Sequence, residues 1–185
     1  MSDDIQHLIA CAQNNDLDSF RQIVERHQQF VYNVAFRFLA DPDGARDVVQ
    51  ECFIRLWKNL HRFDARQKLT TWLYKIVLNL CYDDMRRAYN RRRCAVAEEV
   101  VSFAQTDSDD VEQAMHNAEL AAKIGQLSGD LKPRQRAVFV LRDLQDLEMA
   151  EIADILHVSV ATAKSNLYYA RQNIRKKCQE LGYLP

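Results

Sequence analysis

Apolar residues recur three and four positions apart along most of the chain, and short polar stretches interrupt this pattern. Such spacing gathers apolar side chains on one face of an α-helix. It predicts helices over Leu17–Phe38, Asp43–Leu60 and Thr70–Arg93. Gly and Pro are sparse, and alternating strand-like runs bounded by turn residues are absent. The pattern therefore predicts an all-α fold.

Near the C-terminus, Glu148–Arg171 predicts two helices joined by a tight turn at His157–Ser159. Ser159 is a good N-cap, because its hydroxyl accepts from an amide one turn on. The expected buried stripe of the second helix is Val160, Ala163, Leu167, Ala170 and Ile174. Neither Asp nor Glu occurs between Ser159 and Gln179. A helix with a basic outer face that follows a short helix and a tight turn indicates a helix-turn-helix that reads duplex DNA. The alternative is an ordinary helical hairpin with a solvated basic face.

Charge is distributed in blocks. Residues 61–95 hold nine Lys and Arg against three Asp and Glu, whereas residues 96–130 hold one against eight. Residues 131–185 are basic again, with nine against six. Two basic segments separated by an acidic one predict two nucleic-acid-facing modules and a connector. We expect two small helical domains, 1–95 and 113–185, the second a helix-turn-helix bundle, joined by a flexible acidic linker over 96–112.

The helix predicted over Thr70–Arg93 mixes aromatic and basic side chains: Trp72, Tyr74, Tyr82 and Tyr89 with Lys75, Arg86, Arg87, Arg91, Arg92 and Arg93. Aromatic rings stack on unpaired bases for about 1–3 kcal/mol each, and the cations bind phosphates. This combination is typical of a surface that holds single-stranded nucleic acid. Trp72 shares a helix face with Ile76 and Leu80, so we interpret Trp72 as mainly a core residue.

Other classes of site are not indicated by the sequence. It contains no phosphate loop, nucleophile elbow or metal-ligand spacing, so we expect no catalytic centre, metal or cofactor. The five cysteines are scattered, which favours reduced thiols, with a redox switch as the alternative. No apolar run reaches the roughly 18 residues of a membrane span, and the first residues do not resemble a signal peptide. We therefore expect a cytoplasmic protein without membrane insertion.

Three motifs, in this order, resemble those of bacterial RNA polymerase sigma factors of the extracytoplasmic-function (ECF) group of the sigma-70 family. ARDVVQECFIRLW (Ala45–Trp57) is similar to the family helix that docks on the clamp helices of the largest polymerase subunit. WLYKIVLNLCYDDMRR (Trp72–Arg87) is similar to its promoter-melting helix. LKPRQRAVFVLR (Leu131–Arg142), followed by EIADILHVSVATAKSNL (Glu151–Leu167), is similar to its C-terminal DNA-reading domain.

The resemblance implies a promoter-specificity subunit rather than an enzyme. Its implied partners are core RNA polymerase, through the clamp helices and the flap region, promoter DNA, and an anti-sigma factor. Held by an anti-sigma factor, the chain would stay near the membrane; in holoenzyme it would lie with the nucleoid. In the family, the acidic segment between the two domains threads toward the RNA exit path.

The resemblance also implies roles for individual residues. The residues implied to bind polymerase are Arg46, Asp47, Gln50, Glu51 and Trp57. The residues implied to contact the downstream (minus-ten) promoter element are Phe63, Arg66, Lys68, Lys75, Asn79, Arg86 and Arg87. In this chain, Phe63–Lys68 corresponds to the loop that captures a flipped base in the family. The residues implied to contact the upstream (minus-thirty-five) element are Ser159, Thr162, Lys164, Ser165, Asn166, Tyr169 and Arg171.

The chain departs from the family pattern at several positions. His157 stands in the tight turn where glycine is usual, and Leu69 stands where an aromatic residue is common. Asn166 and Tyr169 occupy positions that are often arginine. Arginine favours guanine, whereas asparagine favours adenine. We therefore predict an upstream element that depends less on guanine than is usual in the family.

A competing hypothesis is a transcription regulator that uses the same helix-turn-helix without polymerase. It explains Glu148–Arg171 equally well but leaves Ala45–Trp57 and the aromatic-basic helix without a role. Such regulators usually bind as dimers at half-sites one helical turn apart. The sequence shows no dimerisation heptad.

Overall fold

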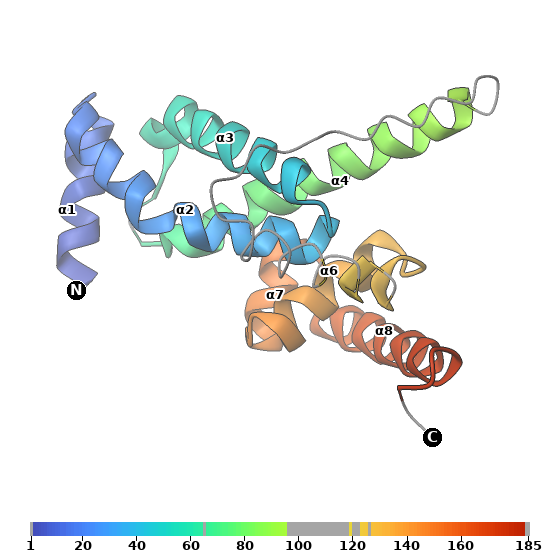
Figure 1. The fold of residues 1–185 in the computed structure, drawn as a ribbon. Helices are drawn as coiled ribbons and strands as arrows, with labels where there is room; N and C mark the ends of the chain where they lie inside the picture. Colours follow the sequence, from blue (N-terminus) through green and yellow to red (C-terminus); the bar gives the residue numbers. More distant parts are fainter. Residues whose placement is uncertain (1, 65, 96–118, 120–122, 126, 184–185) are drawn as a thin grey trace.

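The computed structural model describes residues 2–64, 66–95, 119, 123–125 and 127–183, and within these ranges it contains helices, turns and no strand. The all-α prediction is confirmed. The helices form two groups, α1 to α4 in the N-terminal half and α6 to α8 in the C-terminal half (Figure 1). The predicted acidic linker over 96–112 lies outside the described residues.

Helices α2 (Leu17–Leu39), α3 (Pro42–Asn59) and α4 (Leu69–Ala95) pack against one another in the N-terminal half. Asp16 caps α2 by accepting from the amides of Asp18 and Ser19 at 3.3 and 3.2 Å. Ala40 ends α2 in the left-handed conformation, and Asp41 then caps α3 with Pro42 in its first turn. This proline position suits a helix start, because the first amides have no intrahelical acceptor. The structure thus begins α3 slightly earlier than the expected Asp43.

Helix α1 (Ser2–Gln13) was not predicted from the sequence. Its apolar residues Leu8, Ile9 and Ala12 are buried, and the helix packs on α2. The three-and-four spacing was present, but the segment is short. A single helix of this length is stable only through tertiary packing, which depends on partners distant in sequence.

The boundary expected at Thr70 lies one residue after the observed start of α4. Helix α4 begins at Leu69, which is buried, so Thr70 and Thr71 lie inside the first turn. The Thr71 hydroxyl instead donates to Glu151 Oε1 at 3.1 Å, across to the C-terminal half. Before α4, a single 3₁₀ turn, η1 (Leu60–Arg62), follows α3 and leads into the connector.

The C-terminal half contains α6 (Pro133–Phe139), the π-helical turn η2 (Val140–Leu144), α7 (Met149–Leu156) and α8 (Val160–Glu180). The apolar residues Ala137, Val138, Val140 and Leu141 are all buried. The buried part of α8 begins at Ala163 and continues through Leu167 and Ala170. Val160 was expected in this stripe but is 40% exposed, because it lies in the first turn, before α8 reaches its packing partners.

The turn between α7 and α8 has the geometry of a helix-turn-helix. His157 ends α7 in the left-handed region, with φ 52° and ψ 49°. The Val158 amide bonds back to the Ala153 carbonyl at 3.0 Å, and Ser159 caps α8 by accepting from the Thr162 amide. The expected left-handed residue is therefore present without glycine. Such a conformation costs a non-glycine residue roughly 1–2 kcal/mol.

The two halves touch along α2 and α4 on one side and α6, η2 and α7 on the other (Figure 1). Arg136 of α6 is buried, and its guanidinium donates to the carbonyls of Phe38, Ser128 and Gly129 at 3.0, 2.6 and 3.1 Å. Phe38 belongs to the last turn of α2, whose carbonyls lack intrahelical partners. The buried Arg136 of the C-terminal half thus donates a hydrogen bond to the C-terminal end of α2 in the N-terminal half.

Candidate polymerase and nucleic-acid interfaces

The polar face of α3 is solvent-accessible. Arg46, Asp47 and Gln50 are exposed and Glu51 is half-buried. Arg46 pairs with Asp43 at 2.6 Å, and Glu51 pairs with Arg55 at 2.8 Å. Asp47, Gln50 and Glu51 recur at helical spacing, so this face offers carboxylates and a carboxamide on one rigid element. We refer to Arg46, Asp47, Gln50 and Glu51 as the α3 polar face.

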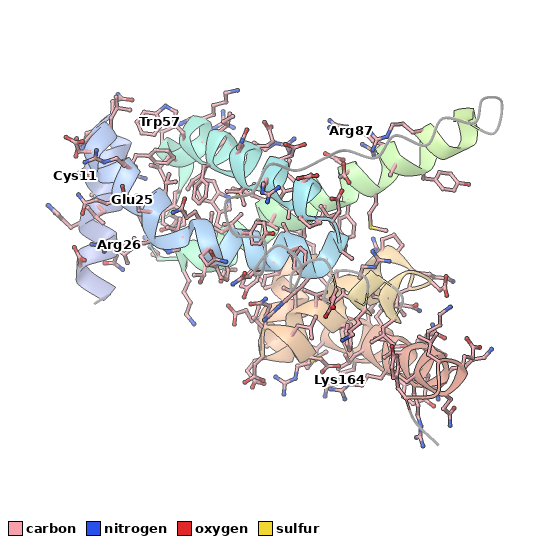
Figure 2. All side chains as sticks on the ribbon, in the orientation of Figure 1. Cys11, Glu25, Arg26, Trp57, Arg87 and Lys164 are labelled. Atoms are coloured by element: carbon pink, nitrogen blue, oxygen red, sulfur yellow. The ribbon has the colours of Figure 1, made fainter. Side chains whose placement is uncertain are left out.

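Trp57 differs from the other residues proposed for polymerase binding. It is half-buried, and its ring lies 4.7 Å from that of Phe20 on α2, at a tilted angle. Figure 2 shows Trp57 near the end of α3 that lies toward α1. The ring is therefore engaged in packing within the N-terminal half, and Ile54, 46% exposed, is the large apolar side chain that α3 presents to solvent.

A groove of about 460 Å³ lies between the end of α3, the connector and α4. Its lining is Arg55, Asn59, Arg62, Phe63, Asp64, Gln67, Trp72, Ile76 and Asn79. Phe63 is only 8% exposed, and its ring stacks on Trp72 at a centroid distance of 5.1 Å. Trp72 and Ile76 are half-buried and pack on the core, and Leu80 is buried, as the sequence indicated. Arg66 and Lys68 are exposed in the connector. We refer to this feature as the aromatic groove.

The cations of α4 have different surroundings. Arg86 and Arg87 are exposed, and Figure 2 shows Arg87 on the part of α4 that extends beyond the bundle. Arg86 pairs with Asp83 at 2.9 Å. Lys75 is instead covered, with a side chain 20% exposed and an ammonium 2.9 Å from Asp154 of α7. Asn79 is exposed and lines both the aromatic groove and a second cavity of about 220 Å³ between the halves.

Three further polar contacts join the halves around Lys75. Thr71 donates to Glu151, and the Tyr74 hydroxyl donates to Gln145 Oε1 at 3.4 Å. Arg37 donates to the Leu144 carbonyl. Burial raises the pKa of Tyr74 to about 12, so its hydroxyl stays protonated and can donate at neutral pH. The acidic edge of α7, formed by Glu151 and Asp154, thus lies against the first two turns of α4.

On α8, three of the residues predicted for DNA binding also bond within the helix. The Ser159 and Thr162 hydroxyls are 2.8 Å apart, and the Asn166 amide donates to the Thr162 carbonyl at 2.9 Å. Lys164, Ser165 and Tyr169 are exposed. Figure 2 shows Lys164 in the C-terminal half, well separated from Trp57 and Arg87. The exposed residues lie on a helix face that the described part of the chain leaves accessible.

Arg171 is held by Asp143, with its Nε and Nη2 atoms 3.0 and 2.5 Å from the two carboxylate oxygens. The hydrogen bond to Asp143 raises the pKa of Arg171 above its ordinary value. This bidentate geometry fixes the guanidinium beside a groove of about 550 Å³ along α8. Arg142, Tyr168 and Arg175 also line that groove and were not predicted. Arg142 lies in η2, so only the fold brings it to α8.

Two cysteines lie deep in the N-terminal core. Burial raises the pKa of Cys52 to about 12, and burial also raises the pKa of Cys81. The reactive form of cysteine is the thiolate, so these two thiols are unreactive at neutral pH. Among the described residues, no group of three or more His, Cys, Asp or Glu side chains is placed to bind a metal ion. Within the same ranges, no helix combines the length and apolar character needed to cross a bilayer.

Comparison with known proteins identifies the family. The model for sigma-70 region 2 matches residues 23–92, and the model for sigma-70 region 4 matches residues 121–174. The chain belongs to the sigma-70 family. It is 32% identical over 183 residues to the ECF RNA polymerase sigma factor SigW of Bacillus subtilis, covering 96% of this chain and 98% of that protein. It is 30% identical to the RNA polymerase sigma-H factor of Pseudomonas aeruginosa, covering 95% and 94%.

Solved structures share the fold of this sigma factor. CnrH, in complex with the cytosolic domain of CnrY, superposes with a TM-score of 0.72 at 24% identity and covers 96% of this chain and 98% of that chain. RpoE of Bartonella quintana, in complex with the anti-sigma factor NepR, gives 0.66 at 20% identity, covering 88% and 98%. The region 2 match includes most of α2, all of α3 and most of α4. The region 4 match includes α6, α7 and most of α8, whereas α1 precedes both.

Proposed function

We propose that this sigma factor joins core RNA polymerase through the α3 polar face and directs initiation at promoters that it reads with both halves. The observation that carries the proposal is that one chain combines an exposed polar helix, an aromatic groove and a helix-turn-helix. Residues 1–95 would form the docking and melting domain, residues 96–112 the linker, and residues 113–185 the duplex-reading domain. The chain would supply no catalytic group of its own.

In this proposal each surface binds a different partner. Arg46, Asp47, Gln50 and Glu51 meet the clamp helices of the largest subunit, while Trp57 supports α3 from behind. Lys164, Ser165 and Tyr169, which are exposed, meet the upstream element in the major groove. Ser159, Thr162 and Asn166 shape the start of α8, and Arg171 lines the groove beside it. The C-terminal half would also meet the polymerase flap region.

Melting would be driven by binding energy at the aromatic groove. An unpaired base gains stacking and polar contacts that a paired base cannot make. Trp72 and Phe63 supply the aromatic wall, and Asn59 and Asn79 supply amides that can pair with a base edge. Arg66 and Lys68 in the connector, with Arg86 and Arg87 on α4, are accessible for phosphates. Phe63 would act as part of the wall rather than as an exposed probe, since it is buried.

In this arrangement the C-terminal half covers part of the surface of α4 that is proposed to bind the downstream element. We call this arrangement the closed form. Lys75 is paired with Asp154, and Asn79 borders the cavity between the halves. DNA that follows α4 to Lys75 must therefore displace α7. We propose that the halves separate when the chain binds polymerase and promoter, and that Asp154 occupies the place of a phosphate until then.

The regulator hypothesis is less well supported. A helix-turn-helix that acts without polymerase needs neither the α3 polar face nor the aromatic groove. Both features lie in residues that match sigma-70 region 2. An anti-sigma partner is a further proposal, because RpoE of Bartonella quintana is in complex with one. The exposed Ile54 beside the α3 polar face would give such a partner an apolar anchor.

The proposed function is tested by transcribing fragmented genomic DNA with core polymerase, with and without the chain, and mapping RNA 5′ ends. We expect a limited set of start sites that appear only when the chain is present. Their upstream sequences should share two elements. Start sites that do not depend on the chain would contradict the proposal.

Lys164→Ala should weaken binding to such a promoter and reduce its salt dependence. Each phosphate contact contributes about 0.9 to the slope of log affinity against log salt. We expect the slope to fall in magnitude by about one. The measurement is fluorescence anisotropy of holoenzyme binding across a salt series. Lys176→Ala is the control, because Lys176 is exposed on the same helix and pairs with Glu180. An unchanged slope in Lys164→Ala would remove Lys164 from the phosphate contacts.

Asp154→Asn should increase the affinity of the free chain for single-stranded DNA, because it releases Lys75. A partly exposed ion pair is worth up to about 1 kcal/mol, so we expect roughly a fivefold increase. The probe is a fluorescent mixed-sequence 12-mer. Glu148→Gln is the control, since Glu148 precedes α7 and pairs with Arg142 of η2 in the C-terminal half. Equal increases in both variants would show a general charge effect and contradict the closed form.

A further inference from the structure

The last residue of α1 reaches the connector beside the aromatic groove. The Gln13 side-chain amide donates to the Leu60 carbonyl at 3.0 Å and to the Phe63 carbonyl at 3.1 Å. Both acceptors lie just after α3, 47 and 50 residues further along the chain. The Leu60 carbonyl also accepts from the Phe63 amide at 3.0 Å, so it receives two hydrogen bonds. One carboxamide has two N–H donors and can satisfy both.

With these bonds, the backbone and the ring of Phe63 are both held in place. Its amide bonds to the Leu60 carbonyl at 3.0 Å, its carbonyl accepts from Gln13, and its ring stacks on Trp72. Because the ring forms one wall of the aromatic groove, the backbone position of Phe63 sets the width available to a base. Gln13 thus holds this position from outside the groove, through the carbonyls of Leu60 and Phe63.

Gln13 is not needed to hold α1 in place. Leu8, Ile9 and Ala12 are 6, 3 and 3% exposed and anchor the helix on the N-terminal core. Burial of such apolar side chains contributes more to stability than two neutral hydrogen bonds do. Removing the Gln13 donors should therefore loosen the connector while leaving the helix docked.

We propose that Gln13 is a positioning residue for base capture: it holds the connector so that Phe63 and Trp72 form a groove of fixed width. The inference rests on the proposed function, because it assumes that the aromatic groove receives an unpaired promoter base. It goes beyond that function by assigning a role to α1, which precedes both stretches that match the family. Gln13 contacts no DNA in this proposal and acts through the connector.

The adjacent residue provides a matched control. The Asn14 side-chain amide donates to the Ala10 carbonyl of its own helix at 3.0 Å and is exposed. Gln13→Glu and Asn14→Asp each exchange an amide for a carboxylate and add one negative charge, yet only the first faces the connector carbonyls. Gln13→Lys restores N–H donors at that position and serves as the rescue variant.

The first readout is hydrogen exchange of the backbone amides of residues 60–68 in the free full-length chain. We expect exchange at least fivefold faster in Gln13→Glu than in wild type. Asn14→Asp and Gln13→Lys should stay within twofold of wild type, and the thermal midpoint should fall by no more than a few degrees in any of the three. Equal exchange in Gln13→Glu and Asn14→Asp would overturn the role of Gln13 in holding the connector. A large drop in thermal midpoint specific to Gln13→Glu would also overturn it, by showing a structural role.

The second readout is RNA yield from a promoter obtained in the genomic transcription experiment. With Gln13→Glu we expect a five- to tenfold lower yield at unchanged affinity for core polymerase, with recovery in Gln13→Lys. Yield equal to that of Asn14→Asp would overturn the role in base capture. If the wild-type chain directs no start sites, the proposed function fails, while hydrogen exchange still decides whether Gln13 holds the connector.

Discussion

Replacing Asp47, Gln50 and Glu51 together with alanine should lower the affinity of the chain for core RNA polymerase by about 100-fold, or roughly 2.7 kcal/mol. Asp47 and Gln50 are exposed on α3, and Glu51 is half-buried beside them. Polar groups that become desolvated at the centre of an interface commonly dominate its binding energy. The variant should fold normally, because its one known ion pair, between Glu51 and Arg55, is partly exposed and worth little.

The measurement is competition binding against labelled wild-type chain on core polymerase. The control is the triple variant Asp18→Ala, Gln22→Ala, Glu25→Ala, which removes the same three residue types from the exposed side of α2. A double variant, Asp47→Ala with Gln50→Ala, tests Glu51 separately, because Arg55 lines the aromatic groove and is released when Glu51 is lost. Wild-type affinity in the α3 triple variant would place the docking surface elsewhere.

Arg136→Met should lower the free energy of unfolding by about 2–4 kcal/mol. Arg136 is 6% exposed, and its guanidinium bonds three carbonyls from two separate segments of the chain, Phe38 at the end of α2 and the adjacent pair Ser128 and Gly129. Hydrogen bonds to a charged group contribute about 1.5–3 kcal/mol, and an abandoned buried acceptor adds its own desolvation cost. Methionine preserves part of the side-chain volume, so the loss reports mainly on the hydrogen bonds.

Urea denaturation followed by circular dichroism measures the change. Arg134→Met is the control, since Arg134 lies two residues earlier on α6 and is exposed. We expect it to change stability by less than about 0.5 kcal/mol. Equal effects of the two substitutions would mean that the Arg136 bonds add nothing to stability. Because the Phe38 carbonyl belongs to the N-terminal half, Arg136→Met should also loosen the contact between the halves.

The sequence predicted best what depends on neighbouring residues. Ser159 caps α8 and His157 ends α7 in the left-handed region, because capping and turn geometry are set within a few positions. The buried residues of α8, Ala163, Leu167 and Ala170, followed from helical period alone. The α3 polar face is accessible, as predicted, because a polar stripe on a half-buried helix remains in solvent.

Features that depend on distant residues were missed. Arg136 reads as a surface cation, and only the fold brings the Phe38 carbonyl, 98 residues earlier, within hydrogen-bond distance. Lys75 was predicted as a DNA contact, but its partner Asp154 is 79 residues away. The sequence did not indicate the contact of Gln13 with the connector, because its acceptors are backbone carbonyls, which every residue has. The roles predicted for individual polymerase and DNA contacts remain predictions.

The most direct test of the central claim is co-elution of the purified full-length chain with bacterial core RNA polymerase on a sizing column. We predict a stoichiometric complex, formed by wild type and by the α2 triple variant and lost in the α3 triple variant. If the folded wild-type chain, free of any inhibitor, elutes apart from core polymerase at micromolar concentrations, the claim that it joins polymerase is wrong. The helix-turn-helix would then act as a regulator without polymerase.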